Sequence, residues 1–105
     1  MNGKMGKMLK QIQKMQSQME KVQEELNNRT LEATSGGGAV RCVVSGSREL
    51  KELVIDPSIL QEDDVEMVQD LIIAAVNEAM RAAEKMVSDE MGKITGGMGM
   101  PPGMF

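Results

Sequence analysis

Apolar residues recur at alternating steps of three and four over the first part of the chain. The set is Met5, Met8, Ile12, Met15, Met19, Val22 and Leu26, and Lys, Gln and Glu fill most of the positions between them. This is a heptad repeat with Met5 at position a, typical of a helix that packs against another helix. The pattern predicts a helix over about residues 4–28, because no Gly or Pro occurs between Lys7 and Asn28. Such a helix is roughly 38 Å long, so part of it must project from a small domain or lie against another chain.

Shorter segments with the period of a β-strand follow. Residues 30–34 alternate weakly, residues 39–45 are rich in valine, and residues 50–55 form a third apolar segment that ends at Asp56-Pro57. Glycines at 36–38 and the pair at 46–47 predict turns between these segments. In the middle segment the alternation separates two sets, namely Val40, Cys42 and Val44 on one side and Arg41 and Val43 on the other. We therefore expect a three-stranded antiparallel meander over about residues 30–56.

A second amphipathic helix is predicted over about residues 63–91. Its apolar stripe is Val65, Val68, Ile72, Ala75, Ala79, Ala82 and Met86, widened by Leu71, Ile73, Val76, Met80, Ala83 and Val87. Acidic residues at 62–64 and 66 are expected in the first turn, where the helix dipole favours them, and Gly92 is expected to end the helix. Residues 96–105 lack a period and predict a flexible tail. The fold class is α+β, with the order α-β-β-β-α.

The composition excludes several kinds of chemistry. The chain has 105 residues, enough for one domain over about residues 1–95, with a net charge of −4, no His, one Cys and one aromatic residue. Without His there is no Ser-His-Asp or Cys-His pair. Cys42 alone forms neither a zinc site nor an internal disulfide, and is expected to be a small core residue. We expect no enzyme activity, cofactor, metal or small-molecule substrate. No apolar run is long enough to span a membrane and no secretory signal is present, so we expect a cytoplasmic protein.

Self-association is predicted because a three-stranded sheet is too small to cover two long amphipathic helices. Sharing helices and sheet between two copies solves this problem, and two-fold dimers are the most frequent arrangement. The residues expected at the homodimer interface are Met8, Ile12, Met15 and Met19 of the first helix with Ile72 and Val76 of the second. The alternative is a single chain in which the two helices pack against each other as a hairpin.

Positive charge is concentrated at the N-terminus. Residues 1–21 contain five lysines and one glutamate, a net charge of +4, whereas the rest of the chain has 7 basic and 15 acidic residues and a net charge of −8. Lys7, Lys14 and Lys21 share heptad position c, with Lys10 at position f, so they form a stripe that faces away from the apolar seam. Such a stripe can follow a phosphate backbone. The candidate DNA-binding residues are Lys4, Lys7, Lys10, Lys14 and Lys21, together with Arg81 and Lys85 of the second helix.

Other interpretations of these residues stay open. A lysine stripe can be an ordinary solvated helix face, and Arg81 and Lys85 can pair with nearby carboxylates of the same helix. The many methionines of the seam are expected in a core, but polarizable Met side chains also suit an adaptable protein-binding surface. The three glycines at 36–38 are not a phosphate-binding loop, since no Gly-Lys-Ser/Thr follows them.

Five segments together resemble the YbaB/EbfC family of bacterial nucleoid-associated proteins, over nearly the whole chain. They are Lys7-Met8-Leu9-Lys10-Gln11, Val54-Ile55-Asp56-Pro57-Ser58, Glu62-Asp63-Asp64 leading into Leu71, Ala74-Ala75-Val76-Asn77-Glu78-Ala79, and Met100-Pro101-Pro102-Gly103. The order and spacing of these segments are specific to the family, although each is weak alone. The short, Met-rich tail departs from the family pattern.

The resemblance implies a tweezer-like α/β homodimer that binds DNA in the nucleoid of the bacterial cytoplasm. It transfers no base-contacting residue, so the lysine stripe rests on helix geometry alone. The hypothesis is a non-enzymatic protein that binds duplex DNA as a homodimer, mainly through phosphate contacts, and affects nucleoid organisation and gene expression. The alternative is a protein–protein adaptor that uses the Met-rich seam or the tail to engage a replication or recombination partner.

Overall fold

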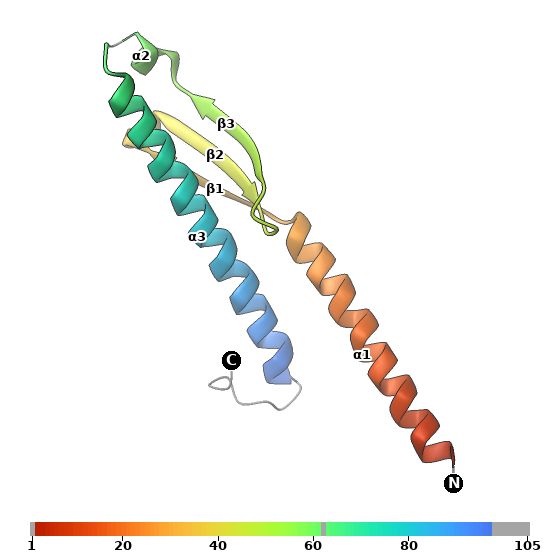
Figure 1. Ribbon diagram of the computed structural model, residues 1–105. Helices are drawn as coiled ribbons and strands as arrows, with labels where there is room; N and C mark the ends of the chain where they lie inside the picture. Colours follow the sequence, from red (N-terminus) through yellow and green to blue (C-terminus); the bar gives the residue numbers. More distant parts are fainter. Residues whose placement is uncertain (1, 62, 98–105) are drawn as a thin grey trace.

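A computed structural model describes residues 2–61 and 63–97 (Figure 1). The elements follow in the order α1 (Asn2–Asn28), β1 (Thr30–Ser35), η1 (Gly36–Gly38), β2 (Val40–Ser45), β3 (Leu50–Ile55), α2 (Pro57–Leu60) and α3 (Val65–Gly97). The expected α-β-β-β-α order is therefore confirmed. The expected tail over residues 96–105 falls partly on α3, and its remainder, residues 98–105, lies outside the described residues.

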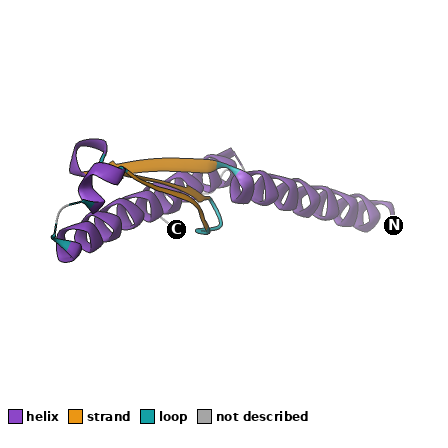
Figure 2. Cartoon of the chain, turned by 90° about the horizontal axis from the view of Figure 1, so that it is seen from above, coloured by secondary structure: helices purple, strands orange, loops and turns teal. Residues whose placement is uncertain are grey.

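Helix α1 projects from the rest of the chain as an arm (Figures 1 and 2). Every described side chain from Lys4 to Gln18 is exposed. The principal extents are 77 × 25 × 16 Å and the radius of gyration is 20.5 Å, against about 13 Å for a compact domain of this length. The two long helices do not pack along their length, so the intramolecular hairpin is not formed. Helix α1 ends at Asn28, after which the Arg29 N–H bonds back to the carbonyls of Glu25 and Leu26 at 3.1 and 3.2 Å.

The three strands form an antiparallel sheet in the order β1-β2-β3. The β1–β2 connection needs backbone that only glycine adopts readily, since Gly36, Gly37 and Gly38 have φ of 60°, 67° and 98°. A register shift between Val43 and Val44 marks a β-bulge facing β3. Arg48, in the β2–β3 turn, also has a positive φ of 65°. Both turns of the meander thus contain residues with a positive φ.

Helix α3 packs across β1 and β2 and forms the core (Figures 1 and 2). The predicted inner face of β2 is confirmed, because Val40, Cys42 and Val44 are fully buried against the alanines of α3 at 75, 79 and 83. Small side chains let the helix backbone approach the sheet closely. The Cys42 thiol donates a hydrogen bond to the Ala75 carbonyl at 3.2 Å.

The buried stripe of α3 is narrower than its apolar pattern predicts. Val65 and Ile73 are 69% and 56% exposed, although the sequence places both in the stripe. The reason is that α3 lies over β1 and β2 and leaves the inner face of β3 uncovered. Leu53 pairs with Cys42 across the ladder and so shares its face, yet it is 40% exposed. An apolar strip therefore remains open along β3.

Both ends of α3 differ from the sequence prediction. Asp64 precedes the helix and its Oδ1 accepts the Met67 N–H at 2.9 Å, and Glu66 is the only acidic residue of the first turn. At the other end the helix continues through Gly92 to Gly97. A helical glycine costs only about 1 kcal/mol relative to alanine, and Ile94, two residues further on, reaches α1. The tertiary contact therefore outweighs the local stop signal.

The base of α1 is held by the β2–β3 turn. Leu26 is 1% exposed, and the buried Gly46 lies directly against its main chain. The Gly46 N–H donates to the Arg29 carbonyl at 2.8 Å, and Ser47 N–H donates to the Asn27 carbonyl at 3.4 Å. Arg29 also forms an ion pair with Glu90 of α3 at 3.9 Å. These contacts set the direction in which the arm leaves the sheet.

Candidate nucleic-acid interface

The five N-terminal lysines all lie on the arm and are all exposed. A helix rises 1.5 Å per residue, so Lys7, Lys14 and Lys21 repeat every ~10 Å along one face, with Lys10 beside them. Among the described residues, no carboxylate oxygen lies within 4.0 Å of any of these lysine ammonium groups, whereas seven ion pairs occur elsewhere. The arm therefore presents positive charge that no described acidic side chain neutralises.

Most cations outside the arm are paired. The ion-paired residues are Arg29, Arg41, Lys51, Arg81 and Lys93. Arg81 is a candidate DNA-binding residue, but its Nη2 atom lies 2.9 Å from Oε2 of Glu78. Arg81 therefore forms the ion pair within α3 that the sequence analysis gave as the alternative. Lys85, the other candidate on α3, has no such partner among the described residues. A phosphate would have to displace Glu78 to reach Arg81, but it would meet no carboxylate at Lys85.

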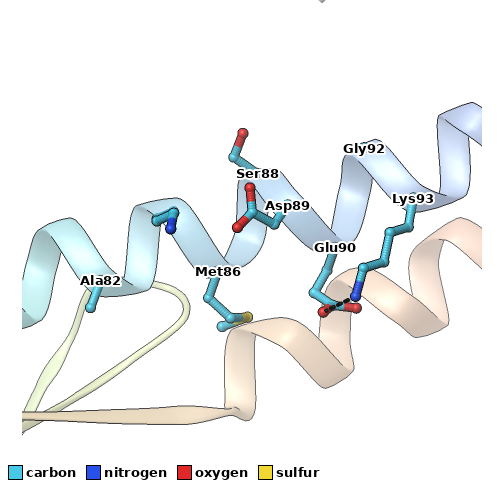
Figure 3. A pocket seen from close by; sticks show the side chains of 8 residues that line it. Ala82, Met86, Ser88, Asp89, Glu90, Gly92 and Lys93 are labelled. Carbon is cyan, nitrogen blue, oxygen red and sulfur yellow. Dashed lines mark hydrogen bonds and ion pairs between the residues drawn. The ribbon is translucent and has the colours of Figure 1, made fainter. Parts of the chain in front are cut away.

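The α1 lysines and the α3 candidates belong to different surfaces. The second half of α1 lies beside the C-terminal half of α3, where Glu90 pairs with Arg29 just past α1 and Ile94 shares clefts with α1. Figure 3 shows Met86 and Glu90 on the side of α3 that faces α1, and Glu90 paired with Lys93 at 3.2 Å. The structure brings the five lysines together on the arm, while Arg81 and Lys85 lie on the body.

The open face of the sheet carries a charge ladder that the sequence analysis missed. Arg41 binds Glu32 at 2.8 Å and Glu52 at 3.2 Å. The hydrogen bond from Arg41 lowers the pKa of Glu32, and Glu32 raises the pKa of Arg41. Strand alternation places all three on one face, which was the signal that could have found them. Because Arg41 is already paired with two carboxylates, this face of the sheet is not suited to binding phosphate.

One unpaired arginine was also missed. Arg48 lies in the β2–β3 turn, at a cleft lined by Gln23 and Asn27 of α1 and Ser88 of α3, and it has no ion pair among the described residues. Its position directly after Gly46-Ser47 in a predicted turn was the available signal, because turn residues are exposed. Glu84 also lines this cleft, so the site is mixed in charge.

The predicted interface residues fall into two groups. Met8, Ile12 and Met15 lie on the arm and are 62%, 48% and 42% exposed, and Met19 is half-buried. Ile72 and Val76 are half-buried beside the core, on the flank of α3. Near the base of the arm, Ile94 forms an apolar cleft of about 340 Å³ with the seam side of α1. Both groups thus leave apolar surface uncovered in the single chain.

The described residues offer little other functional chemistry. They contain no group of three His, Cys, Asp or Glu side chains that could hold a metal ion. None of their helices has the length and apolar character to cross a membrane. Burial raises the pKa of the Cys42 thiol, which faces the core. Its position is that of a packing residue, as the sequence predicted.

Nearly the whole chain matches known proteins. The model of the YbaB/EbfC DNA-binding family matches residues 1–98. A nucleoid-associated protein of Ruminiclostridium cellulolyticum is 53% identical over 98% of this chain and 90% of its own. One from Alkaliphilus metalliredigens is 56% identical over 96% and 88%. The crystal structure of the uncharacterized protein HP0035 from Helicobacter pylori has a TM-score of 0.73 and 25% identity, covering 84% of this chain and 92% of that one. Taken with the fold and the lysine-bearing arm, these matches show that the chain belongs to the YbaB/EbfC family of nucleoid-associated DNA-binding proteins.

Proposed function

We propose that this protein binds duplex DNA as a homodimer, mainly through phosphate contacts made by the lysines of α1. It thereby organises the nucleoid in the bacterial cytoplasm and affects gene expression. The observation that carries the proposal is the set of five exposed lysines on one arm, none paired with a carboxylate among the described residues. The family supports DNA as the partner.

The arm suits phosphate better than bases. Lysine ammonium groups are point charges that bind phosphate without reading sequence. The arm has no aromatic residue that could stack on a base. Gln11 and Gln18 are exposed and can reach a base edge, so we expect at most a weak sequence preference. When a protein contacts only the phosphate backbone of DNA, its affinity for DNA falls steeply as the salt concentration rises.

The homodimer is supported by apolar surface that the single chain leaves open. The seam of α1 is exposed from Met5 to Met15, and the uncovered strip of β3 includes Leu50 and Leu53, each exposed by 40% or more. Ile72 and Val76 lie on the adjoining flank of α3. Monomeric proteins rarely leave apolar patches of this kind uncovered. Light scattering with size-exclusion chromatography should give twice the chain mass of 11.4 kDa, and a single chain mass at all concentrations would contradict the dimer.

The DNA contact is tested by fluorescence anisotropy of a labelled duplex across a salt series. The double variant Lys7→Ala/Lys14→Ala removes two unpaired lysines, and the control Lys51→Ala/Lys93→Ala removes the same charge from two ion-paired positions. Each phosphate contact contributes about 0.9 to the slope of log K against log salt. We therefore expect the first variant to flatten the slope by about 1.8 for each engaged arm, and the control to change it little.

Two results would contradict the phosphate-binding arm. If both double variants weaken binding equally, net charge rather than the arm decides affinity. If the folded dimer binds no duplex even at low salt, the lysines are a solvated face. The adaptor function would then be favoured by the apolar cleft that Met15, Met19, Val22 and Ile94 line, which fits apolar side chains of a protein partner.

A further inference from the structure

Helix α3 leads the chain toward the exposed part of the arm. Glu90 forms an ion pair with Arg29, just past the base of α1, whereas Ile94 shares a cleft with Met19, which lies further along the arm. The two helices are therefore antiparallel where they meet, and α3 ends at Gly97 directed along the arm (Figure 1). The chain that follows Gly97 starts beside the apolar seam of α1.

The seam is open from this cleft to the far end of the arm. Met5, Met8, Ile12 and Met15 are all exposed. An isolated helix as short as the projecting stretch, residues 4–18, is only marginally stable in water, where roughly 12–15 residues are the lower limit. The cleft at the base has a volume of about 340 Å³ and is lined mainly by apolar side chains. The arm therefore offers an apolar surface that a further segment can cover, beginning at this cleft.

Residues 98–105 have the composition of a segment that fits this surface. They read Met-Gly-Met-Pro-Pro-Gly-Met-Phe, with no charged residue and with the single aromatic residue of the chain. Methionine is flexible and fills irregular apolar gaps. Two consecutive prolines exclude a regular helix and favour the extended polyproline II conformation. Such a segment can lie in an apolar groove without burying a charge.

The length of this segment matches the open seam. Its eight residues span roughly 25 Å in the polyproline II conformation. The seam from Met19 to Met5 covers fourteen helical residues, or roughly 21 Å. The open apolar surface around Ile73 is too far away, because Ile73 lies twenty-four helical residues before Gly97, or roughly 36 Å. The segment can therefore cover the whole seam but cannot reach that other surface.

We infer that residues 98–105 lie along the apolar seam of α1 in the same chain. Helix α3 tethers the segment beside the seam at an effective concentration in about the millimolar range, an advantage over any apolar segment of a separate molecule. Each arm is then covered by its own chain and stands apart from other arms. The lysines at positions c and f face away from the seam and stay exposed. The proposed dimer is then held by the open strip of β3 and the adjoining flank of α3.

The direction of α3 sets the register of this contact. Met100 lies three helical and three extended residues beyond Ile94, roughly 14 Å along the arm. Val22 shares two clefts with Ile94, and Ile12 lies ten helical residues beyond Val22, roughly 15 Å along the same path. Met100 is thus expected opposite Ile12.

Disulfide cross-linking tests this register. In a Cys42→Ala background, Ile12→Cys/Met100→Cys places one thiol on the seam and one in the segment, and a disulfide requires their Cβ atoms to be about 3.5–4.5 Å apart. The matched control, Gln13→Cys/Met100→Cys, moves the first thiol by one residue to the outer side of the arm. We expect the seam pair to form a disulfide about tenfold faster than the control, because docking raises the local thiol concentration. Circular dichroism checks that each variant is helical.

The mass of the product on a non-reducing gel identifies what covers the seam. A disulfide within one chain is the expected product. A disulfide-linked dimer as the main product means that a second copy covers the seam, and equal rates for the two pairs mean that the segment has no preference for it. Either result overturns the inference, as does the absence of a disulfide in both pairs. Cross-linking does not depend on DNA, so a chain that cross-links but binds no duplex refutes the proposed function and leaves this inference standing.

Hydrogen exchange tests the cover without engineered thiols. The variant Met98→Ser/Met100→Ser/Met104→Ser removes three apolar side chains and adds no charge. Its control, Gly99→Ser/Gly103→Ser, introduces the same polar side chain between them. In the methionine variant the amides of residues 5–15 should exchange about tenfold faster than in wild type, because the arm opens more readily without its cover. The control should keep the wild-type rate. Unchanged exchange in the methionine variant contradicts docking of the segment on the seam.

Discussion

Gly46 offers a sharp test of how the arm is joined to the sheet. A Cβ atom added there would lie 1.9 Å from the Leu26 carbonyl oxygen, 2.8 Å from the carbonyl carbon and 3.2 Å from Met86 Cε. The first two atoms belong to the main chain, so no side-chain rotation relieves the clash. Gly46 is not in the left-handed backbone region, and the effect of Gly46→Ala is therefore steric.

The expected loss of stability follows from the contacts that must give way. Overpacking a filled site costs about 1–3 kcal/mol, and separating Gly46 from Arg29 weakens a 2.8 Å hydrogen bond worth about 0.5–1.5 kcal/mol. Together they predict a destabilisation of roughly 3 kcal/mol. For a domain of this size that corresponds to a fall in Tm of roughly 10–25 °C.

The assay is thermal unfolding followed by circular dichroism, at one fixed protein concentration because self-association makes Tm depend on concentration. Gly92→Ala is the matched control. Gly92 is helical, and an added Cβ meets nothing within 4 Å, so alanine should stabilise the helix by about 0.8–1 kcal/mol. The two Gly-to-Ala changes are thus expected to act in opposite directions. A Tm for Gly46→Ala within about 2 °C of wild type would refute the packing described at the base of α1.

Three further predictions concern the core and the open face of the sheet. Cys42, buried and with a raised pKa, should react with a maleimide only slowly until denaturant is added, and rapid labelling of the native protein would contradict its burial. Ser35→Ala should cost about 0.5–1.5 kcal/mol in urea unfolding, because the serine hydroxyl donates to the Leu71 carbonyl at 2.5 Å. Glu32 should titrate by NMR below its usual pKa, and Arg41→Ala should return that pKa toward normal. Its folded pKa is lowered, so its stabilising contribution is present above the ordinary carboxylate pKa and is lost as pH falls through the lowered value.

Much of the fold could be predicted from residues close together in the sequence. The heptad spacing of α1, the alternation of Val40, Cys42 and Val44, and the glycines at 36–38 each act over a few residues, and the structure confirms them. The lysine stripe likewise follows from helix geometry alone, since its residues share one helix. What the sequence could not supply was whether each cation meets a carboxylate. The pairing of Arg41 with Glu32 and Glu52 joins three strands and requires the sheet register.

The sequence by itself determined the element order and the two sides of the arm, because hydrophobic period and turn chemistry are local properties. Only the tertiary structure decided where α3 ends and which apolar residues stay exposed. Gly92 does not stop α3, since the helix goes on to bring Ile94 against α1, and Ile73 stays open because α3 covers only two of the three strands. The projection of α1 depends on the contact of Gly46 with Leu26, twenty residues apart in the chain. Such close packing between distant segments has no signature in local sequence, because it depends on how the elements come together.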